Sequence, residues 1–136
     1  MKTLLTILVS LVTMLPTHAK YGETLAECIA RYGPARNNTK PGTPTVFIKS
    51  PFAVSILFER GRAANVNYQR LETDTPNHSK PIAAADILKI LKQNAPDTSW
   101  REQKKQDGTR IWATTDGKLV ALYSEASHVL NIQSAK

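Results

Sequence analysis

Few side chains in this sequence have the type and spacing that enzyme or metal chemistry requires. After the first nineteen residues the histidines are His78 and His128, and the single cysteine is Cys28. These positions lack the close spacing of a zinc-binding motif. Ser127 directly precedes His128, but neighbours on a strand point to opposite faces, so the two are not placed to act as nucleophile and base.

The carboxylates and glycines offer no clearer catalytic site. Glu72 and Asp74 are close in sequence, but they fall in a polar stretch with Pro76 that lacks the sheltered environment needed to shift one pKa for acid–base work. Phosphate-binding glycine loops and a Gly-x-Ser-x-Gly nucleophile elbow are absent from the sequence. We therefore predict a protein that is not an enzyme and that holds no metal or cofactor. A hydrolase is kept as a third alternative, because a small mixed fold can hold a site that motifs do not show.

The N-terminal residues have the pattern of a secretory signal. Lys2 supplies a positive charge, Leu4 to Leu15 form a short apolar run, and Ala19 ends a small-residue cleavage motif. The run is shorter than the roughly 20 apolar residues that span a bilayer. We predict that residues 1–19 are removed as a signal peptide and that residues 20–136 form a single secreted or periplasmic domain without a membrane span.

The formal net charge of +7 favours acidic partners such as nucleic acid, anionic lipid or an acidic protein surface. Removal of Lys2 with the signal peptide would lower this charge to +6. The basic residues are scattered, however, and they lack the interleaved aromatic residues of proteins that bind single-stranded nucleic acid. A solvated, mildly basic surface is the simpler interpretation.

The best-defined element is a helix that begins after Thr24. Thr24 and Glu27 have the spacing of a capping box, and Gly33 followed by Pro34 is a typical helix end. The predicted apolar stripe of this helix is Leu25, Cys28, Ile29 and Tyr32. Its position on that stripe makes Cys28 a buried small side chain rather than a reactive thiol.

A second helix is predicted between Pro81 and Pro96. Pro81 suits the first turn, where a missing N–H costs nothing, and Asn94 to Pro96 end the pattern. The predicted apolar stripe is Ala84, Ile87, Leu88 and Leu91.

The remaining chain alternates as β-strands do. Strands are predicted at 46–48, 52–58, 64–68, a short run from Trp100, 111–115, 118–123 and 128–132. Ala64, Val66 and Tyr68 are expected on one face of their strand. Gly61 marks one hairpin, and Asp116-Gly117 marks another in which both central residues are expected to have positive φ.

The order helix, three strands, helix, three or four strands predicts an α+β domain with two helices packed on one antiparallel sheet. The halves 23–72 and 80–133 match in kind but poorly in residue identity. A tandem α-β-β-β repeat is therefore suggested rather than established.

This layout resembles small periplasmic α+β domains of the β-lactamase-inhibitor-protein type and of the small outer-membrane-assembly lipoprotein type. The likeness is carried by the helix from Thr24 to Pro34 and by the hairpin from Phe52 to Tyr68 around Gly61. The chain lacks the lipoprotein's anchoring cysteine and the inhibitor's disulfides. It also looks similar to uncharacterised secreted bacterial proteins of this size. The resemblance implies a scaffold that binds other proteins, with no site residues to transfer.

Two hypotheses about function follow from these observations. The first is a non-enzymatic protein-binding domain, inhibitor-like or an envelope accessory, with Trp112 either in the core or exposed beside Arg110 as a recognition patch. The second is a binder of polyanions or small ligands that uses a basic, concave sheet face. Its predicted contact residues are Arg60, Arg62, Arg70 and Arg110.

Overall fold

A computed structural model describes residues 20–37, 40–71 and 79–136. The predicted signal peptide, the Glu72 and Asp74 pair and His78 lie outside these ranges. The elements are α1 (Leu25–Tyr32), β1 (Thr45–Lys49), β2 (Phe52–Glu59), β3 (Arg62–Leu71), β4 (Ser79–Lys80), α2 (Ala84–Asn94), β5 (Trp100–Glu102), β6 (Thr109–Thr114), β7 (Leu119–Ser124) and β8 (Val129–Ser134). Neither described helix combines the length and apolarity needed to cross a bilayer.

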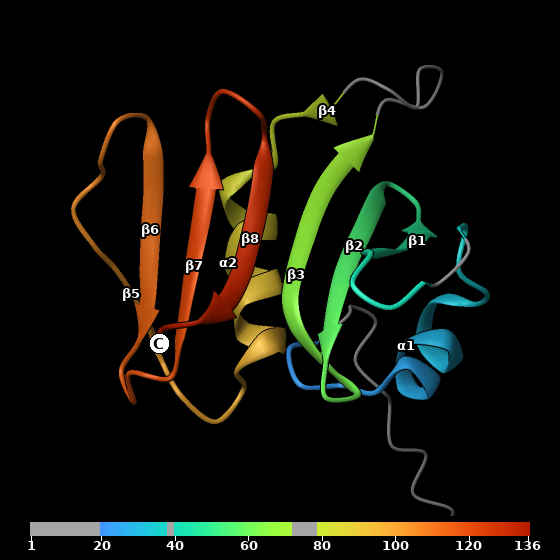
Figure 1. Cartoon of the computed structure of the whole chain (residues 1–136). Helices are drawn as coiled ribbons and strands as arrows, with labels where there is room; N and C mark the ends of the chain where they lie inside the picture. Colours follow the sequence, from blue (N-terminus) through green and yellow to red (C-terminus); the bar gives the residue numbers. More distant parts are fainter. Residues whose placement is uncertain (1–19, 38–39, 72–78) are drawn as a thin grey trace, which may run out of the picture.

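The strands form one antiparallel sheet in the order β1-β2-β3-β8-β7-β6-β5, with the short β4 paired to β3 (Figure 1). Each half of the chain contributes a helix and three longer strands, and the last strands of the two halves, β3 and β8, pair at the centre. The predicted α+β class is confirmed. The tandem repeat remains a prediction, because neither β4 nor β5 has an equivalent strand in the other half.

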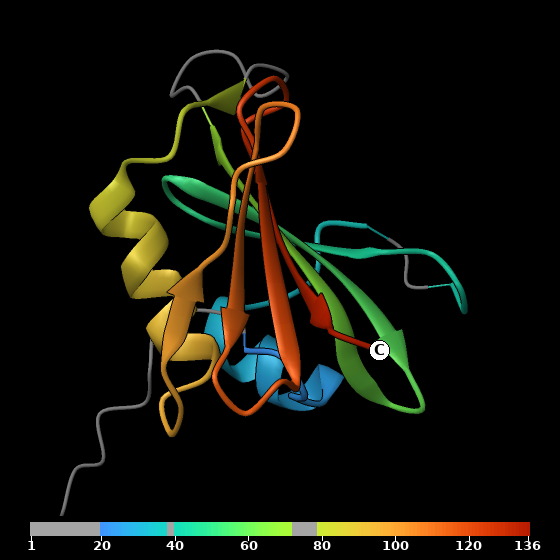
Figure 2. The ribbon, with the colours of Figure 1, turned by 90° about the vertical axis from the view of Figure 1, so that its left-hand side faces the viewer.

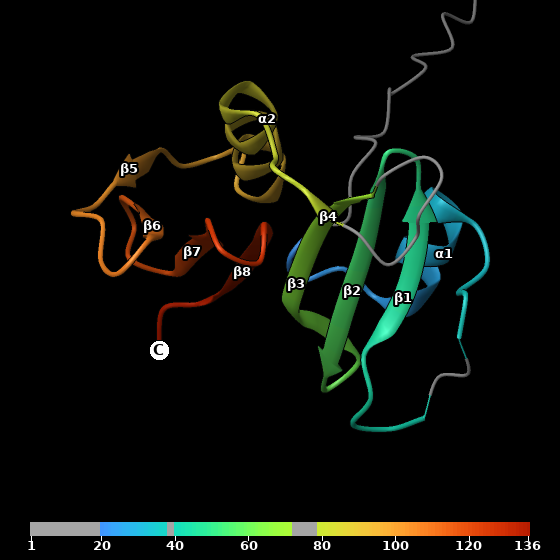
Figure 3. The same ribbon diagram turned by 90° about the horizontal axis from the view of Figure 1, so that it is seen from above.

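Both helices pack against the same face of this sheet, as predicted, and none of the described segments covers the opposite face (Figures 2 and 3). The core is continuous across the two halves. Neighbouring strands align their inward side chains in rows, for example Ile56, Val66 and Ile132. All three are completely buried, so the hydrophobic effect acts on one shared core rather than on two separate layers.

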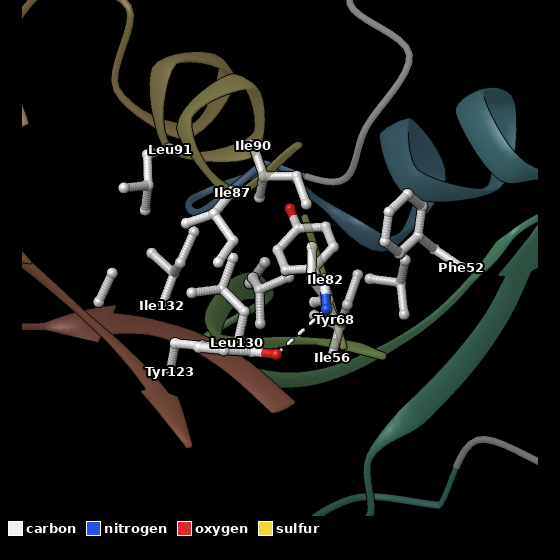
Figure 4. Close-up of a cluster of buried hydrophobic side chains, with 14 of the residues drawn as sticks. Phe52, Ile56, Tyr68, Ile82, Ile87, Ile90, Leu91, Tyr123, Leu130 and Ile132 are labelled. Carbon is white, nitrogen blue, oxygen red and sulfur yellow. Dashed lines mark hydrogen bonds between the residues drawn. The ribbon is translucent and has the colours of Figure 1, made fainter. Parts of the chain in front are cut away.

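Two tyrosines join the helical layer to the sheet (Figure 4). The Tyr123 hydroxyl accepts a hydrogen bond of 3.1 Å from the backbone N–H of Ile82, just before α2. The buried hydroxyl of Tyr68 accepts one of 3.0 Å from Nδ2 of Asn94 at the end of α2. These bonds satisfy polar groups that would be costly to bury alone.

The predicted capping box of α1 is present, but its apolar stripe is partly wrong. Thr24 Oγ1 accepts from the Glu27 N–H, and the Glu27 carboxylate accepts from the Thr24 N–H. Cys28 is fully buried, whereas Ile29 is 42% exposed. Arg31 faces inward instead, because its guanidinium pairs with the buried carboxylate of Glu23. An ion pair thus takes one of the inward positions of this helix, beside the apolar contacts of Cys28.

The predicted stripe of α2 is also partly wrong. Ile87 and Leu91 are buried, but Ala84 and Leu88 are exposed, and Ile90 and Asn94 take the inward positions. The sequence contains two overlapping stripes of helical spacing, and contacts with the sheet select the later one. Asn94 fits there because its amide bonds the Tyr21 N–H, the Tyr68 hydroxyl and the Ile90 carbonyl.

Pro81 does not lie in the first turn of α2. The helix starts at Ala84 after an uncapped Ala83. The intervening Ile82 is buried and donates its N–H to the Tyr123 hydroxyl. Because Ile82 is bonded to the sheet in this way, the helix begins later than predicted.

A β-bulge makes the predicted alternation of β3 wrong at its first position. Phe58 pairs with Ala63 and Leu57 pairs with Asn65, so Ala64 is an extra residue on this strand. The bulge shifts the alternation by one position, and Ala63 is buried where Ala64 was expected. Val66 and Tyr68 are buried as predicted.

The predicted hairpins are present, but one turn has a different geometry. Arg60 and Gly61 both have positive φ in the two-residue turn between β2 and β3. In the β6–β7 turn only Gly117 has positive φ, and Asp116 does not. That loop is longer, and the Asp116 carboxylate accepts from the Thr114 hydroxyl and the Lys118 N–H. These hydrogen bonds hold the pKa of Asp116 below its usual value.

Candidate functional site

The open face of the sheet, defined as the face without helices, is the largest candidate surface. Its centre is a strip of side-chain amides on the paired strands β3 and β8. Asn65 lies beside Gln133, and Asn67 lies beside Asn131. Gln69 continues the row opposite Val129. All these side chains are half-buried, although no other element among the described residues packs on them.

The amide strip is a connected hydrogen-bond network. Asn131 Nδ2 donates to Oδ1 of Asn65 at 2.6 Å and to Oδ1 of Asn67 at 2.9 Å. Asn67 Nδ2 also donates to Asn65, and Asn65 Nδ2 donates to Oε1 of Gln133. Because Asn65, Asn67, Asn131 and Gln133 hold one another, this part of the strip presents a fixed pattern of polar atoms. Within the described ranges Oδ1 of Asn131 and Nε2 of Gln133 have no protein partner, so both remain available to a ligand.

Aliphatic side chains flank the amide strip on both sides. On the β1–β2 side they include Val46, Ile48 and Leu57, and on the β6–β7 side they include Ile111, Val120 and Leu122. The alternation of each strand places them outward, since their neighbours in sequence point into the core. The open face is therefore polar at its centre and apolar at its flanks.

The centre of the open face carries no charge. Among the described residues, Asp, Glu, Lys and Arg occur at outward positions only at its margins: Glu59 and Arg62 at the β2–β3 turn and Arg101 on the edge strand β5. This is unusual in a chain of net charge +7. Depletion of charge at the centre is a feature of protein–protein interfaces.

The two edges of the sheet are poorly suited to pairing with a further strand. At β1, Asn37 Oδ1 accepts from the Val46 N–H and the Arg36 N–H donates to the Val46 carbonyl. These contacts occupy outward-facing backbone groups of the strand. At the other edge, β5 has only three residues and exposes Arg101. Short, covered or charged edges resist strand addition, so a partner has better access to the open face.

The structure does not bring the four predicted arginines together. Arg60 and Arg62 lie at the β2–β3 turn, and Arg70 lies about 26 Å farther along β3. Arg70 points to the helical side, 3.9 Å from the Asp86 carboxylate. Arg110 is also on the helical side and forms two hydrogen bonds with Glu102, which raise its own pKa and lower that of Glu102. A single basic sheet face is therefore absent from the described part of the chain.

Trp112 lies in the core, which decides between its two predicted roles. Its side chain is 2% exposed, and the Arg110 guanidinium lies 4.8 Å from the centre of its ring. Trp100 is half-buried and donates from Nε1 to the Leu91 carbonyl at 2.7 Å. Neither ring reaches the open face, so of the two alternatives left open for Trp112 the structure shows the core position.

The ionisable groups of the described residues do not cluster as a metal site would require. No group of three or more His, Cys, Asp or Glu side chains lies close enough there to hold a metal ion. His128 has positive φ just before β8, and its Nδ1 lies 3.1 Å from the Ser79 carbonyl. Cys28 lies 3.9 Å from Oε2 of Glu23 in a buried setting. Burial and the Glu23 charge raise the pKa of Cys28 to about 12, so the thiol is a poor nucleophile.

This raised pKa predicts a pH-dependent contribution of Cys28 to stability. An unfolded cysteine titrates near pH 8.5, so below that pH the contribution is fully present. Between about pH 8.5 and the folded pKa of about 12, the unfolded chain ionises first and the contribution is lost. The stability of the native protein relative to Cys28→Ala should therefore fall on going from pH 8 to pH 10.5 in urea titrations. A difference independent of pH would contradict this.

The amide strip was not anticipated as a site. Its signal in the sequence is the alternation Asn65, Asn67, Gln69 and Asn131, Gln133, which also fits any solvated strand. Only the pairing of β3 with β8 joins the two series. No family model matches this chain, and comparisons with curated proteins and with solved structures likewise find no match.

Proposed function

We propose that this domain is a non-enzymatic module that binds another protein through the open face of its sheet. The observation that carries the proposal is the charge-free centre of this face, where a hydrogen-bonded amide strip lies between two aliphatic flanks. Such a surface can bury apolar area and offer hydrogen bonds without the cost of removing charges from water.

Other ligand classes fit this face less well. A polyanion needs clustered cations. Two of the predicted arginines lie at the β2–β3 turn, and the other two lie on the helical side, where each forms an ion pair. Bases of single-stranded nucleic acid need aromatic side chains on which to stack. Phe, Tyr and Trp are missing from the outward positions of the described strands. An extended protein surface with few charges remains the best match.

The predicted signal peptide suggests where such a partner would be met. A secreted or periplasmic location, with an inhibitor-like or envelope-accessory role, rests on residues 1–19 and on the order of elements. The partner is expected to present an uncharged contact area. Its association should therefore depend only weakly on salt, because few ions are released on binding.

The test is site-specific photocrosslinking of the secreted protein in envelope fractions. A photoreactive phenylalanine analogue replaces Leu122 on the open face or, as the matched control, Leu88 on the opposite side, where α2 leaves it 58% exposed. We expect a discrete crosslinked product only from position 122. The captured partner is then purified, and its affinity is measured for the native protein and for Leu122→Lys and Leu88→Lys.

Leu122→Lys should weaken binding at least about tenfold, because a lysine on the apolar flank of the interface is desolvated without an acidic partner. Leu88→Lys should leave affinity unchanged. Circular dichroism and thermal melting check that both variants fold. Crosslinking from position 88 alone, equal losses in the two variants, or a steep decrease of affinity with salt would contradict binding through the open face.

A further inference from the structure

A small cavity lies on the helical side of the sheet, away from the open face. Its volume is about 260 Å³, and it lies between the start of α1, the loop that precedes β1 and the end of β2. Its walls include Leu25, Phe58, Thr43 and Thr45. The lining also includes Lys40, Pro41, Gly42 and Gly61, and a Cβ added at either glycine would meet no atom within 4 Å. The cavity is thus open space beside the backbone rather than a gap closed by side chains.

This cavity is a place where the core is incomplete. Phe52, Val54 and Ile56 alternate along β2 and are buried, and Phe58 continues the same row but stays half-buried. Leu25 is the first residue on the inward side of α1 and is also only half-buried. Both side chains contact the main core on one side and line the cavity on the other. A small apolar group in this position would complete the burial of both.

The surroundings of the cavity favour a negative charge on that group. Lys40 forms part of the wall, and Arg60 directly precedes Gly61 at the turn. Leu25 is the first residue of α1, so the positive end of the helix dipole also lies here. The carboxylates on the same elements are Glu59 and Glu27, and the latter is engaged by the Thr24 N–H.

We propose that this cavity is a binding site for a small carboxylate with a short apolar chain, its chain on Leu25 and Phe58 and its carboxylate toward Lys40. The cavity is smaller than the roughly 300–1,000 Å³ of sites for drug-sized ligands. Its size therefore limits the occupant to a small molecule with a short alkyl chain, such as octanoate. This site is independent of the open face, and it can exist whether or not the domain binds a protein there.

The test is an NMR titration of residues 20–136 with octanoate, 1-octanol and octylammonium, each below its micellar concentration. Octanoate should cause saturable shifts of the amide signals of Leu25, Gly42, Thr45 and Gly61, with a dissociation constant of roughly 1 mM. Signals of the open face, such as that of Leu122, should not move. Octylammonium should bind at least about fivefold more weakly than octanoate.

A matched pair of variants tests the role of the charge. Lys40→Glu should weaken octanoate binding about fivefold, whereas Lys49→Glu, at the end of β1 and outside the cavity lining, should not. Octanoate shifts that do not saturate, or that spread over the whole surface, would overturn the proposal. Equal binding of octanoate and octylammonium, or equal effects of the two variants, would also overturn it.

Discussion

Replacement of Trp112 by alanine is expected to lower the free energy of unfolding by about 3–5 kcal/mol. The indole is 2% exposed, lies opposite Ala121 on β7, and is covered by the Arg110 guanidinium. Its removal leaves a cavity that small neighbours such as Ala121 cannot fill by moving. Urea unfolding followed by circular dichroism measures the loss, because far-ultraviolet signals do not depend on the missing tryptophan.

Two further substitutions separate a packing role from a surface role. Trp112→Phe keeps most of the apolar volume and should cost less than the alanine substitution. Leu88→Ala removes an exposed leucine from α2 and should change stability by no more than about 0.5 kcal/mol. A Trp112→Ala protein as stable as the native one would show that the ring is not part of the core.

Replacement of Glu23 by methionine is the second substitution with a large expected effect, a loss of about 3–5 kcal/mol. Glu23 is 8% exposed and pairs with Arg31, and the two side chains are 10% and 12% exposed. Without the carboxylate, the charge of the Arg31 guanidinium stays in a mostly buried position and loses the negative charge that offset its desolvation. Thermal and urea unfolding of the variant measure the loss.

The control for this prediction is an exposed pair of a glutamate and a basic side chain. Lys105 Nζ lies 2.8 Å from Oε1 of Glu125, and the two side chains are 53% and 45% exposed. Glu125→Met should therefore lower the free energy of unfolding by less than about 1 kcal/mol. The double variant Glu23→Met with Arg31→Met should recover part of the loss, since no charge is then left buried. Equal, small losses for Glu23→Met and Glu125→Met would mean that water reaches the Arg31 guanidinium.

Substitutions on the two faces of the sheet are therefore expected to have different effects. The helical face supplies stability through one continuous core, whose substitutions should unfold the domain. The open face contributes little to that core, so substitutions such as Leu122→Lys can test binding without loss of the fold. This separation makes the proposed function testable in a folded protein.

Local signals in the sequence determined the fold class and most element boundaries. The capping box of Thr24 and Glu27, the stop at Gly33 and the hairpin at Gly61 depend on residues near one another, and the structure contains all three. Strict alternation from Phe52 to Ile56 likewise identified the buried side of β2. Such features follow from the conformational preferences of single residues and from periodicity, so they can be predicted without tertiary contacts.

Tertiary contacts decided what local patterns leave open. Leu88 fits a helical stripe as well as Ile90 does. Only packing on the sheet decides that Ile90 is buried and Leu88 is exposed. The bulge at Ala64 depends on how β3 meets β2. Trp112 was undecided because alternation shows which residues share a face but not which face is covered.

The candidate site also needed the tertiary structure. Asn65 and Asn131 are far apart in sequence, and neither has a local signal that separates it from an ordinary solvated residue. The pairing of β3 with β8 joins them into one network, and the placement of both helices on the other face leaves that network uncovered. Composition determined that this chain is basic, but only the fold determined that its open face has no charge at the centre. The physical reason is that strand pairing and layer packing act between residues distant in sequence, where no local preference specifies the partner.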